Sequence, residues 1–105
     1  MSKIETCSIT GGIFKFEGEF FHCIDGPAIS YPDGYEAWYK FGKLHRENGP
    51  AIIHENARRY YLDGQEVFTS NFEEFQSFVN IWRVGQVLGK SWDEIVYTYS
   101  RLQLI

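Results

Sequence analysis

Cysteine and long hydrophobic runs are both scarce in this 105-residue sequence. The spacing of the two cysteines, Cys7 and Cys23, fits no zinc-binding or redox motif, which predicts reduced thiols and no disulfide. No run of apolar residues exceeds three, whereas a membrane-spanning helix needs about 18, and the first residues lack the apolar segment of a signal peptide. These absences predict a cytoplasmic protein that contacts no membrane.

Clusters of basic residues are also missing. Ten Lys and Arg stand against fourteen Asp and Glu, which gives a formal net charge of -4. Non-specific affinity for nucleic acid comes largely from Lys and Arg that neutralise neighbouring phosphates. Arg58 and Arg59 are the only adjacent basic residues, and neighbours on a strand point to opposite faces. The sequence therefore predicts no nucleic-acid partner.

The middle of the chain contains a repeated unit. Residues 22–29 and 45–52 share His, Gly, Pro, Ala and Ile at the same positions, 23 residues apart. Residues 38–42 and 60–64 both read as an aromatic pair, two further residues and glycine, 22 residues apart. A less regular copy, residues 14–18, precedes the first unit. Such self-similarity predicts one supersecondary structure repeated along the chain.

Glycine and proline divide these repeats into short strands. Glycine readily adopts the positive φ that a tight hairpin turn needs. The expected hairpin tips are Glu17-Gly18, Phe41-Gly42 and Asp63-Gly64. Strands are expected over residues 13–16, 19–23, 28–31, 35–40, 43–46, 51–54, 58–62 and 65–68, with a leading strand near 4–9. The connections are too short for crossover helices, so the sheet must be an antiparallel meander.

Residues 38–51 read Trp-Tyr-Lys-Phe-Gly-Lys-Leu-His-Arg-Glu-Asn-Gly-Pro-Ala. This segment resembles the MORN-like β-hairpin repeat of uncharacterised bacteriophage and giant-virus proteins, and the resemblance covers roughly residues 14–67. It implies a string of hairpins in one sheet that contacts proteins or lipids, and it brings no catalytic residues. Residues 23–24 depart from the polar pair at 46–47, so the first copy is degenerate.

After Phe68 the apolar spacing changes from two residues to about 3.6, as in a helix. Capping boxes are expected at residues 70–73, with Ser70 and Glu73 as partners, and at residues 91–94. The first apolar stripe comprises Phe72, Phe75, Phe78, Val79 and Trp82, and the second comprises Trp92, Ile95, Val96, Tyr99 and Leu102. The first helix is expected to end between Val84 and Leu88, with Gly85 and Gly89 as competing stop signals.

The fold class predicted by these patterns is α+β. An antiparallel β-meander of tandem hairpin repeats, with about seven to nine strands, is followed by two C-terminal amphipathic helices packed on one face of the sheet. Residues 1–105 are expected to form a single domain, in which 1–68 make the sheet and 69–105 make the helical hairpin.

The chemistry-bearing residues favour a structural role. His22 and His45 share a repeat position and, with Cys23, form the one candidate metal site. A structural role explains why histidine recurs at this position, because each unit needs the same contact within its hairpin. The imidazole can form a hydrogen bond with a nearby backbone carbonyl or with the carboxylates of Asp25 and Glu47. No nucleophile motif and no phosphate-binding loop is present. The sequence predicts no metal, no cofactor and no enzymatic activity.

Aromatic residues, by contrast, make up 18% of the chain. On a strand, neighbours such as Trp38 and Tyr39 point to opposite faces, so both faces are expected to carry an aromatic row. Two helices can cover only one face, and aromatic side chains are enriched at protein contact surfaces. The candidate partner-binding residues are Tyr31, Trp38, Tyr39, Tyr60, Tyr61, Arg46 and Arg59.

These observations predict a non-enzymatic protein-binding module. With the resemblance, they predict a virus-encoded accessory or counter-defence protein in the host cytoplasm that binds a host protein and inhibits or redirects it. A homodimer is a second way to cover an exposed row. The alternative function is binding and sequestering a small nucleotide-like ligand, either between aromatic side chains of one chain or at a homo-oligomer interface. The residues available to contact the anion are Lys43, Arg46, Arg58 and Arg59.

Overall fold

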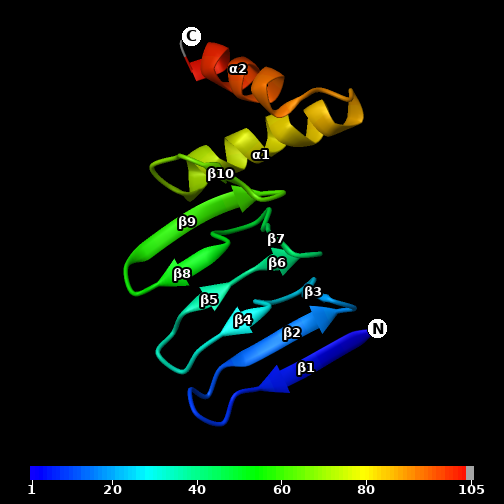
Figure 1. Cartoon of the computed structure of the whole chain (residues 1–105). Coiled ribbons are helices and arrows are strands. Elements are labelled where there is room, and N and C mark those ends of the chain that lie inside the picture. The colour runs from blue at the N-terminus through cyan, green and yellow to red at the C-terminus, as the bar shows by residue number, and fades with distance from the viewer. Residues whose placement is uncertain (104–105) are drawn as a thin grey trace. The chain divides into compact units, whose positions relative to one another are not determined.

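A computed structural model describes residues 1–103 and divides the chain into two compact units, Met1–Phe68 and Thr69–Ile105. The first unit is built of strands and the second of two helices (Figure 1). The change from strand to helix therefore comes where the apolar spacing predicts it. Docking of the helices on the sheet, and with it a single domain, stays a prediction.

The first unit contains ten short strands within the described residues, and all paired strands are antiparallel. They are β1 (Ser2–Thr6), β2 (Ile13–Glu17), β3 (Phe20–Phe21), β4 (Ile29–Ser30), β5 (Glu36–Ala37), β6 (Tyr39–Lys40), β7 (Lys43–Leu44), β8 (Ile52–His54), β9 (Ala57–Leu62) and β10 (Gln65–Val67). Seven pair in the order β1-β2-β4-β5-β8-β9-β10, β3 also pairs with β2, and β6 pairs with β7. The predicted antiparallel meander is confirmed.

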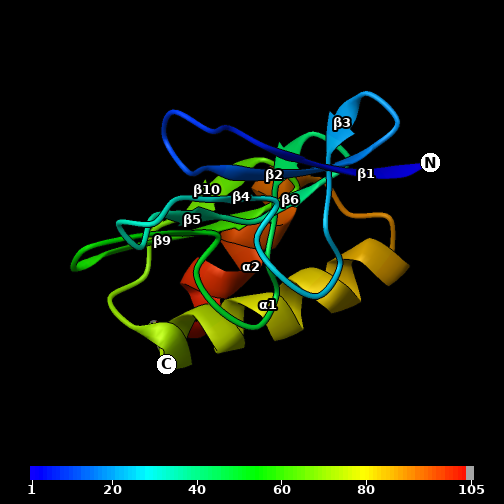
Figure 2. The same cartoon turned by 90° about the horizontal axis from the view of Figure 1, so that it is seen from below.

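In each of the first two repeats, a loop divides the second strand of the hairpin into two short strands. β1 runs along one side of β2, so β3 and β4 share its other side, and residues 22–28 leave the sheet between them. Residues 45–51 leave between β7 and β8 in the same way. We call these two segments the Gly-Pro loops. Both project from the same side of the sheet (Figure 2).

Repeated backbone hydrogen bonds define which residues are equivalent. The Lys15 N–H donates to the Ala28 carbonyl at 2.7 Å, and the Trp38 N–H donates to the Ala51 carbonyl at the same distance. Trp38 therefore corresponds to Lys15, and Tyr39 corresponds to Phe16. Trp38 also separates β5 from β6 within the predicted strand 35–40.

The hairpin tips of the second and third copies are two-residue turns. Phe41 and Gly42 have φ of 46° and 82°, and Asp63 and Gly64 have φ of 48° and 81°. Two successive positive φ angles are those of a type I′ turn, whose twist matches that of the flanking strands. Both of these predicted tips are confirmed.

The tip of the first copy lies one residue later than predicted. Glu17 pairs with Phe20, so the loop is Gly18-Glu19, not Glu17-Gly18. Gly18, with φ of 61°, takes the position of Phe41. The glycine of the first copy thus occupies the first position of its turn, and the glycines of the later copies occupy the second.

Small residues form much of the core of the first unit. Ala28, Ala37 and Ala51 are fully buried, as is Leu62. Ala28 and Ala51 follow the Gly-Pro step of each loop, and their N–H groups donate to the carbonyls of Ala37 and of Arg59 in the next strand. The repeated Gly-Pro-Ala thus marks the point where the chain returns to the sheet.

The second unit consists of α1 (Phe72–Val87) and α2 (Trp92–Gln103). The N-cap of α1 is Asn71, whose side chain accepts a hydrogen bond from the Glu74 N–H at 2.9 Å. The expected box of Ser70 and Glu73 is therefore one residue too early. The box at α2 is confirmed, because Ser91 and Glu94 exchange backbone-to-side-chain hydrogen bonds of 3.0 and 3.2 Å.

Helix α1 ends at Val87, and the glycine that terminates it is Gly89, not Gly85. The Lys90 N–H donates to the Gly85 carbonyl at 2.8 Å, and Gly89 has φ of 70°, as in a Schellman motif. Gly85 instead lies against α2, because a Cβ at this position would come within 2.6 Å of Ile95 Cγ1. Among the described residues, neither helix has the length and apolar character needed to cross a membrane.

Ring contacts join the two helices. The Phe78 ring lies 5.4 Å from the Trp92 ring and 5.1 Å from the Tyr99 ring. The buried residues of the unit are Phe75, Phe78, Val79, Trp82, Gly85 and Ile95. The first predicted stripe is thus largely correct, with only Phe72 at its end exposed, whereas Val96 and Leu102 of the second stripe are exposed.

Candidate protein-contact surface

A row of side chains crosses the sheet on the face opposite the Gly-Pro loops. It consists of Phe16, Phe21, Tyr39, Leu44 and Tyr61, and we call it the aromatic row. Phe16 lies across from Phe21, and Tyr39 lies across from Leu44, in adjacent paired strands. Ring centroids are 4.9 Å apart for Phe16 and Phe21, and 5.4 Å apart for Phe21 and Tyr39. All five side chains are half-buried, so each keeps part of its surface accessible.

A second group of rings continues this surface along the strands. Tyr31 packs edge-on against Phe14 at 5.9 Å and lies 5.7 Å from Tyr35. The Tyr35 ring lies 5.5 Å from the ring of His54. Phe14 connects this group to the aromatic row through Phe21, at 6.4 Å. The sheet therefore has one contiguous face of rings.

Charged side chains stand at both ends of the aromatic row. Lys3 Nζ lies 5.1 Å from the centre of the Phe16 ring. At the other end, Arg59 donates two hydrogen bonds of 2.8 and 2.9 Å to the Glu66 carboxylate, and its guanidinium lies 5.6 Å from the Tyr61 ring. The hydrogen bonds from Arg59 hold the pKa of Glu66 below its usual range. Lys3 is paired with Glu5 at 3.2 Å, so the row ends in an ion pair on each side.

The two tyrosines of the row are neutral at pH 7. Burial raises the pKa of Tyr39, and the nearby Tyr35 adds to the effect. Burial and then the Glu66 carboxylate raise the pKa of Tyr61. The Tyr61 hydroxyl donates to Glu66 Oε1 at 3.4 Å, and the Tyr39 hydroxyl can both donate and accept a hydrogen bond beside its apolar ring.

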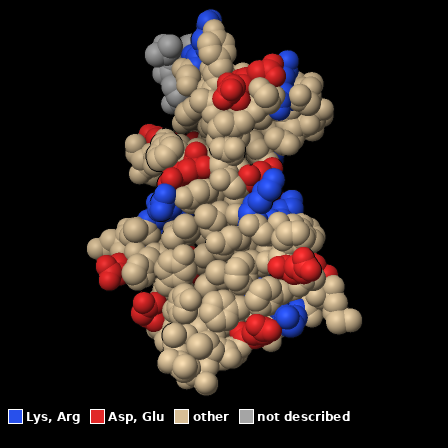
Figure 3. Space-filling view, in the orientation of Figure 1, with Lys and Arg blue, Asp and Glu red and all other residues tan. Residues whose placement is uncertain are grey.

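The face of the sheet seen in Figure 3 is the one turned away from the Gly-Pro loops. Most of it is uncharged, and Asp, Glu, Lys and Arg gather toward its margins (Figure 3). An apolar centre with a charged rim is the usual organisation of a protein contact surface.

The structure divides the predicted contact residues between the two faces. Tyr31, Tyr39, Tyr61 and Arg59 lie with the rings just described. Tyr60 points to the other face and is 8% exposed, so it belongs to the core. Four of the seven candidates are therefore together on one surface.

Trp38 and Arg46 lie on the loop side and contact each other. The Arg46 guanidinium lies 3.7 Å from the centre of the Trp38 ring and donates to the Pro50 carbonyl at 3.2 Å. Burial lowers the pKa of Arg46. Aromatic side chains thus lie on both faces of the sheet, as expected. Because the second Gly-Pro loop covers Trp38 and Tyr60 is buried, the open row is the one on the face opposite the loops.

Sequence reasoning missed several members of the surface: Phe14, Phe16, Phe21, Tyr35, Leu44 and Glu66. When the copies are aligned by their glycines, Lys15 becomes the equivalent of Tyr39. The backbone hydrogen bonds show that Phe16 is the equivalent of Tyr39. A shift of one residue exchanges the faces of a strand. Aligning the copies by their aromatic alternation would have found Phe16.

Comparisons of the chain with protein-family models, with curated proteins and with solved structures give no match. The resemblance of residues 38–51 to the MORN-like repeat stays an expectation from the sequence.

The repeated histidines bind the backbone of the next hairpin. His22 Nδ1 accepts from the Phe41 N–H at 3.0 Å, and His45 Nδ1 accepts from the Asp63 N–H at 2.9 Å. His45 Nε2 also lies 3.1 Å from Glu47, as one of the expected carboxylate contacts. Within residues 1–103, no three His, Cys, Asp or Glu side chains lie together in a way that could hold a metal ion, and both cysteines are free.

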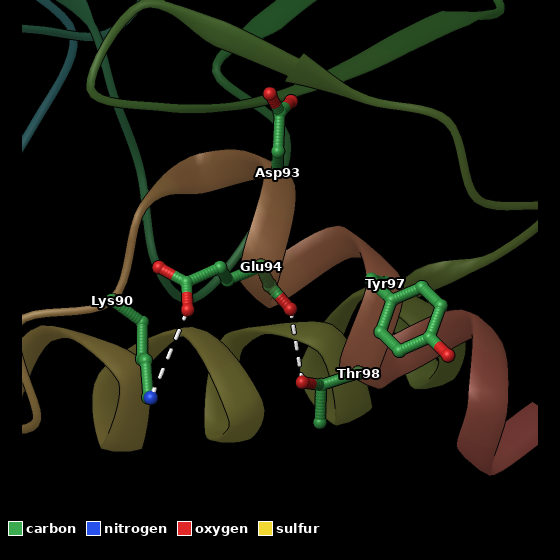
Figure 4. A pocket seen from close by; sticks show the side chains of 5 residues that line it. All are labelled: Lys90, Asp93, Glu94, Tyr97 and Thr98. Carbon is green, nitrogen blue, oxygen red and sulfur yellow. Dashed lines mark hydrogen bonds and ion pairs between the residues drawn. The ribbon is translucent and has the colours of Figure 1, made fainter.

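The second unit has an open pocket of about 320 Å³ beside α2, lined by Lys90, Asp93, Glu94, Tyr97 and Thr98 (Figure 4). Lys90 Nζ lies 3.7 Å from Glu94 Oε2, and the Thr98 hydroxyl donates to the Glu94 carbonyl at 2.9 Å. The lining thus contains two carboxylates and one lysine that is already paired. This charge balance disfavours a phosphate-bearing ligand.

Proposed function

We propose that this protein is a non-enzymatic protein-binding module whose contact surface is the aromatic row. The supporting observation is the contiguous, half-buried band of rings on the sheet face opposite the Gly-Pro loops. Tyrosine and phenylalanine give large contact areas at a low cost in side-chain entropy, which favours them at interfaces.

The contacts of the candidate anion-binding cations favour a protein over a nucleotide-like ligand. Arg59 is held by Glu66, Arg58 donates to the carbonyls of Glu55 and Ala57, and Arg46 lies on Trp38. Three of the four cations expected to hold an anion are thus already engaged within the chain. A protein surface with apolar side chains and hydroxyl-binding groups fits the row better.

We further propose that the partner is a host protein. The resemblance to repeats of bacteriophage and giant-virus proteins supports a virus-encoded accessory or counter-defence protein that binds a host factor and inhibits or redirects it. The chemistry required of that factor is an apolar patch with an acceptor for the hydroxyl of Tyr39.

Affinity capture from a host lysate, followed by binding measurements with the purified partner, tests the proposal. Tyr39→Ala and Tyr61→Ala should each weaken binding on the order of tenfold or more, the effect of removing a central interface aromatic. Tyr97→Ala, which removes a tyrosine that is 62% exposed in the helical unit, should leave binding unchanged.

Tyrosine-selective labelling of the unaltered protein gives a readout that does not depend on the variants folding. The partner should protect Tyr39 and Tyr61 from the reagent and leave Tyr97 reactive. Full reactivity of the row in the complex, or full affinity of folded Tyr39→Ala and Tyr61→Ala proteins, contradicts the proposal.

A further inference from the structure

Strand β1 is an outer strand of the main sheet. Within the described residues, it pairs with β2 alone, and all five of its residues are exposed. The Ile4 side chain at its centre is 67% exposed. An outer strand of this kind has unpaired backbone N–H and C=O groups along one side, which form a template for another strand.

The hydrogen bonds of the hairpin show which residues have these free groups. The Gly18 N–H donates to the Met1 carbonyl, and the Cys7 N–H donates to the Gly12 carbonyl, at the two ends of the β1–β2 register. Hydrogen-bonded pairs alternate along an antiparallel ladder. Residues 3 and 5 therefore bond to β2, and the N–H and C=O groups of Ser2, Ile4 and Thr6 point away from the sheet.

The sequence of β1 is complementary to itself. It reads Ser-Lys-Ile-Glu-Thr, with Ile4 between a cation and an anion. If two copies of β1 run antiparallel about Ile4, Lys3 of each copy lies opposite Glu5 of the other, and Ile4 lies opposite Ile4. The pairs formed by residues 2, 4 and 6 are then the hydrogen-bonded ones, which matches the groups that point outward.

Other registers do not satisfy both conditions. A register centred on Lys3 sets lysine against lysine, and one centred on Glu5 sets glutamate against glutamate, and like charges directly opposite are unfavourable. A register centred between two residues would set outward-pointing groups against inward-pointing ones. The register about Ile4 also has the largest number of paired residues.

We propose that this protein forms a symmetric dimer in which β1 pairs antiparallel with β1 of a second copy, in the register centred on Ile4. Lys3 and Glu5, whose charged groups lie 3.2 Å apart within one chain, would each gain the opposite charge of the partner. Because paired residues share a face, the aromatic rows of the two copies would form one surface. The inference does not rest on the proposed function, and partner binding can hold or fail independently of it.

Charge exchange between two variants tests the register. Lys3→Glu sets glutamate opposite glutamate twice, and Glu5→Lys sets lysine opposite lysine twice, so each should weaken dimerisation on the order of tenfold. An equimolar mixture of the two variants should dimerise again, since both cross-strand pairs are then attractive. The double variant Lys3→Glu/Glu5→Lys should dimerise alone.

An edge contact of five residues buries less than the ~1,000 Å² of a stable interface, so we expect a weak dimer whose population depends on concentration. Sedimentation velocity over a roughly hundredfold range of protein concentration measures the monomer and dimer populations. Lys90→Glu, which makes the same charge change on the helical unit, should behave as the unaltered chain does. A monomer at every concentration, dimers of the single variants as strong as those of the unaltered chain, or a mixture that stays monomeric would each overturn the proposal.

Hydrogen exchange of the unaltered protein supplies a second measurement. The Ile4 amide should become protected as the concentration rises, whereas the Lys3 amide, which bonds to β2, should be protected throughout. Concentration-independent exchange at Ile4 in a protein that does dimerise would place the interface elsewhere and overturn the β1 pairing.

Discussion

The Nδ1 atom of His45 accepts a hydrogen bond of 2.9 Å from the backbone N–H of Asp63, a residue at the tip of the next hairpin. This acceptor role leaves the proton on Nε2, which lies 3.1 Å from the Glu47 carboxylate. His45 is 8% exposed, and His22 makes the equivalent bond to Phe41. The repeated histidine is thus a link between consecutive units.

Replacing His45 should destabilise the sheet. His45→Ala leaves the Asp63 N–H without its acceptor and should lower the free energy of unfolding by about 1–3 kcal/mol. His45→Asn should lose less, because its side-chain oxygen can take the place of Nδ1. Urea unfolding measures both variants, and equal losses would show that the bond to Asp63 contributes little.

Gly49 should tolerate alanine less well than its counterpart Gly26. A Cβ at Gly49 would lie 2.8 Å from Arg46 Cζ and displace the guanidinium from Trp38, whereas a Cβ at Gly26 would meet only Cys23 Sγ, at 3.8 Å. We expect Gly49→Ala to be less stable than Gly26→Ala by roughly 0.5–2 kcal/mol, the range of a cation–π contact.

Thermal or urea unfolding of the two variants gives this difference. The two glycines occupy the same position of the repeat, so the change in the entropy of the unfolded chain is alike and cancels. Equal stabilities would mean that the stacking of Arg46 on Trp38 adds nothing to the fold.

Gly85 should couple to Ile95 across the helix pair. Gly85→Ala places a Cβ within 2.6 Å of Ile95 Cγ1 and should cost about 1–3 kcal/mol through overpacking, despite the higher helix propensity of alanine. Ile95→Ala removes the obstructing atoms at the cost of a buried side chain. In a double-mutant cycle, the double variant should be more stable than the sum of the two losses, and strict additivity would argue against this contact.

Acid should weaken the Arg59–Glu66 pair. The pKa of Glu66 is lower in the folded chain than in the unfolded chain, so its contribution is complete above the unfolded value of about 4.3 and is lost as the pH falls through the folded value. At pH 7 the unaltered protein should be more stable than Glu66→Gln. The urea midpoints should begin to converge below about pH 4.3 and meet once the pH is below the folded pKa of Glu66, and a gap that stays constant with pH would contradict the pairing.

Much of the fold could be predicted from local patterns. The type I′ tips at residues 41–42 and 63–64 and the box at Ser91 follow from chemistry confined to a few residues. Local chemistry leaves Gly85 and Gly89 as competing stop signals for α1, and the packing of Gly85 against Ile95 decides for Gly89. Ser70 and Asn71 each precede a glutamate by three residues, so the sequence offers two N-caps for α1. Only the course of the entering chain decides for Asn71.

The contact surface was harder to predict, because it depends on register across strands. The first copy has glycine at the first position of its turn, and aligning the copies by glycine moved Phe16 to the wrong face. The covering of Trp38 by Arg46 depends on how a loop folds back, and the sequence shows no period for such a contact. The face is therefore fixed by long-range hydrogen bonds that no local pattern contains.

The histidine hydrogen bonds set the order in which the repeats can complete their folding during synthesis. After His22 has been synthesised, its Nδ1 atom has no N–H donor until Phe41 emerges from the ribosome. In the same way, Nδ1 of His45 can accept its hydrogen bond only after Asp63 has emerged. Each repeat is thus finished by the hairpin that follows it, and a nascent chain ending between two repeats always has one incomplete unit. In the last copy, Val67 lies opposite Tyr60 in the β9–β10 hairpin, which is the position that histidine has in the earlier copies. This copy has no histidine at that position and therefore needs no bond to a later hairpin.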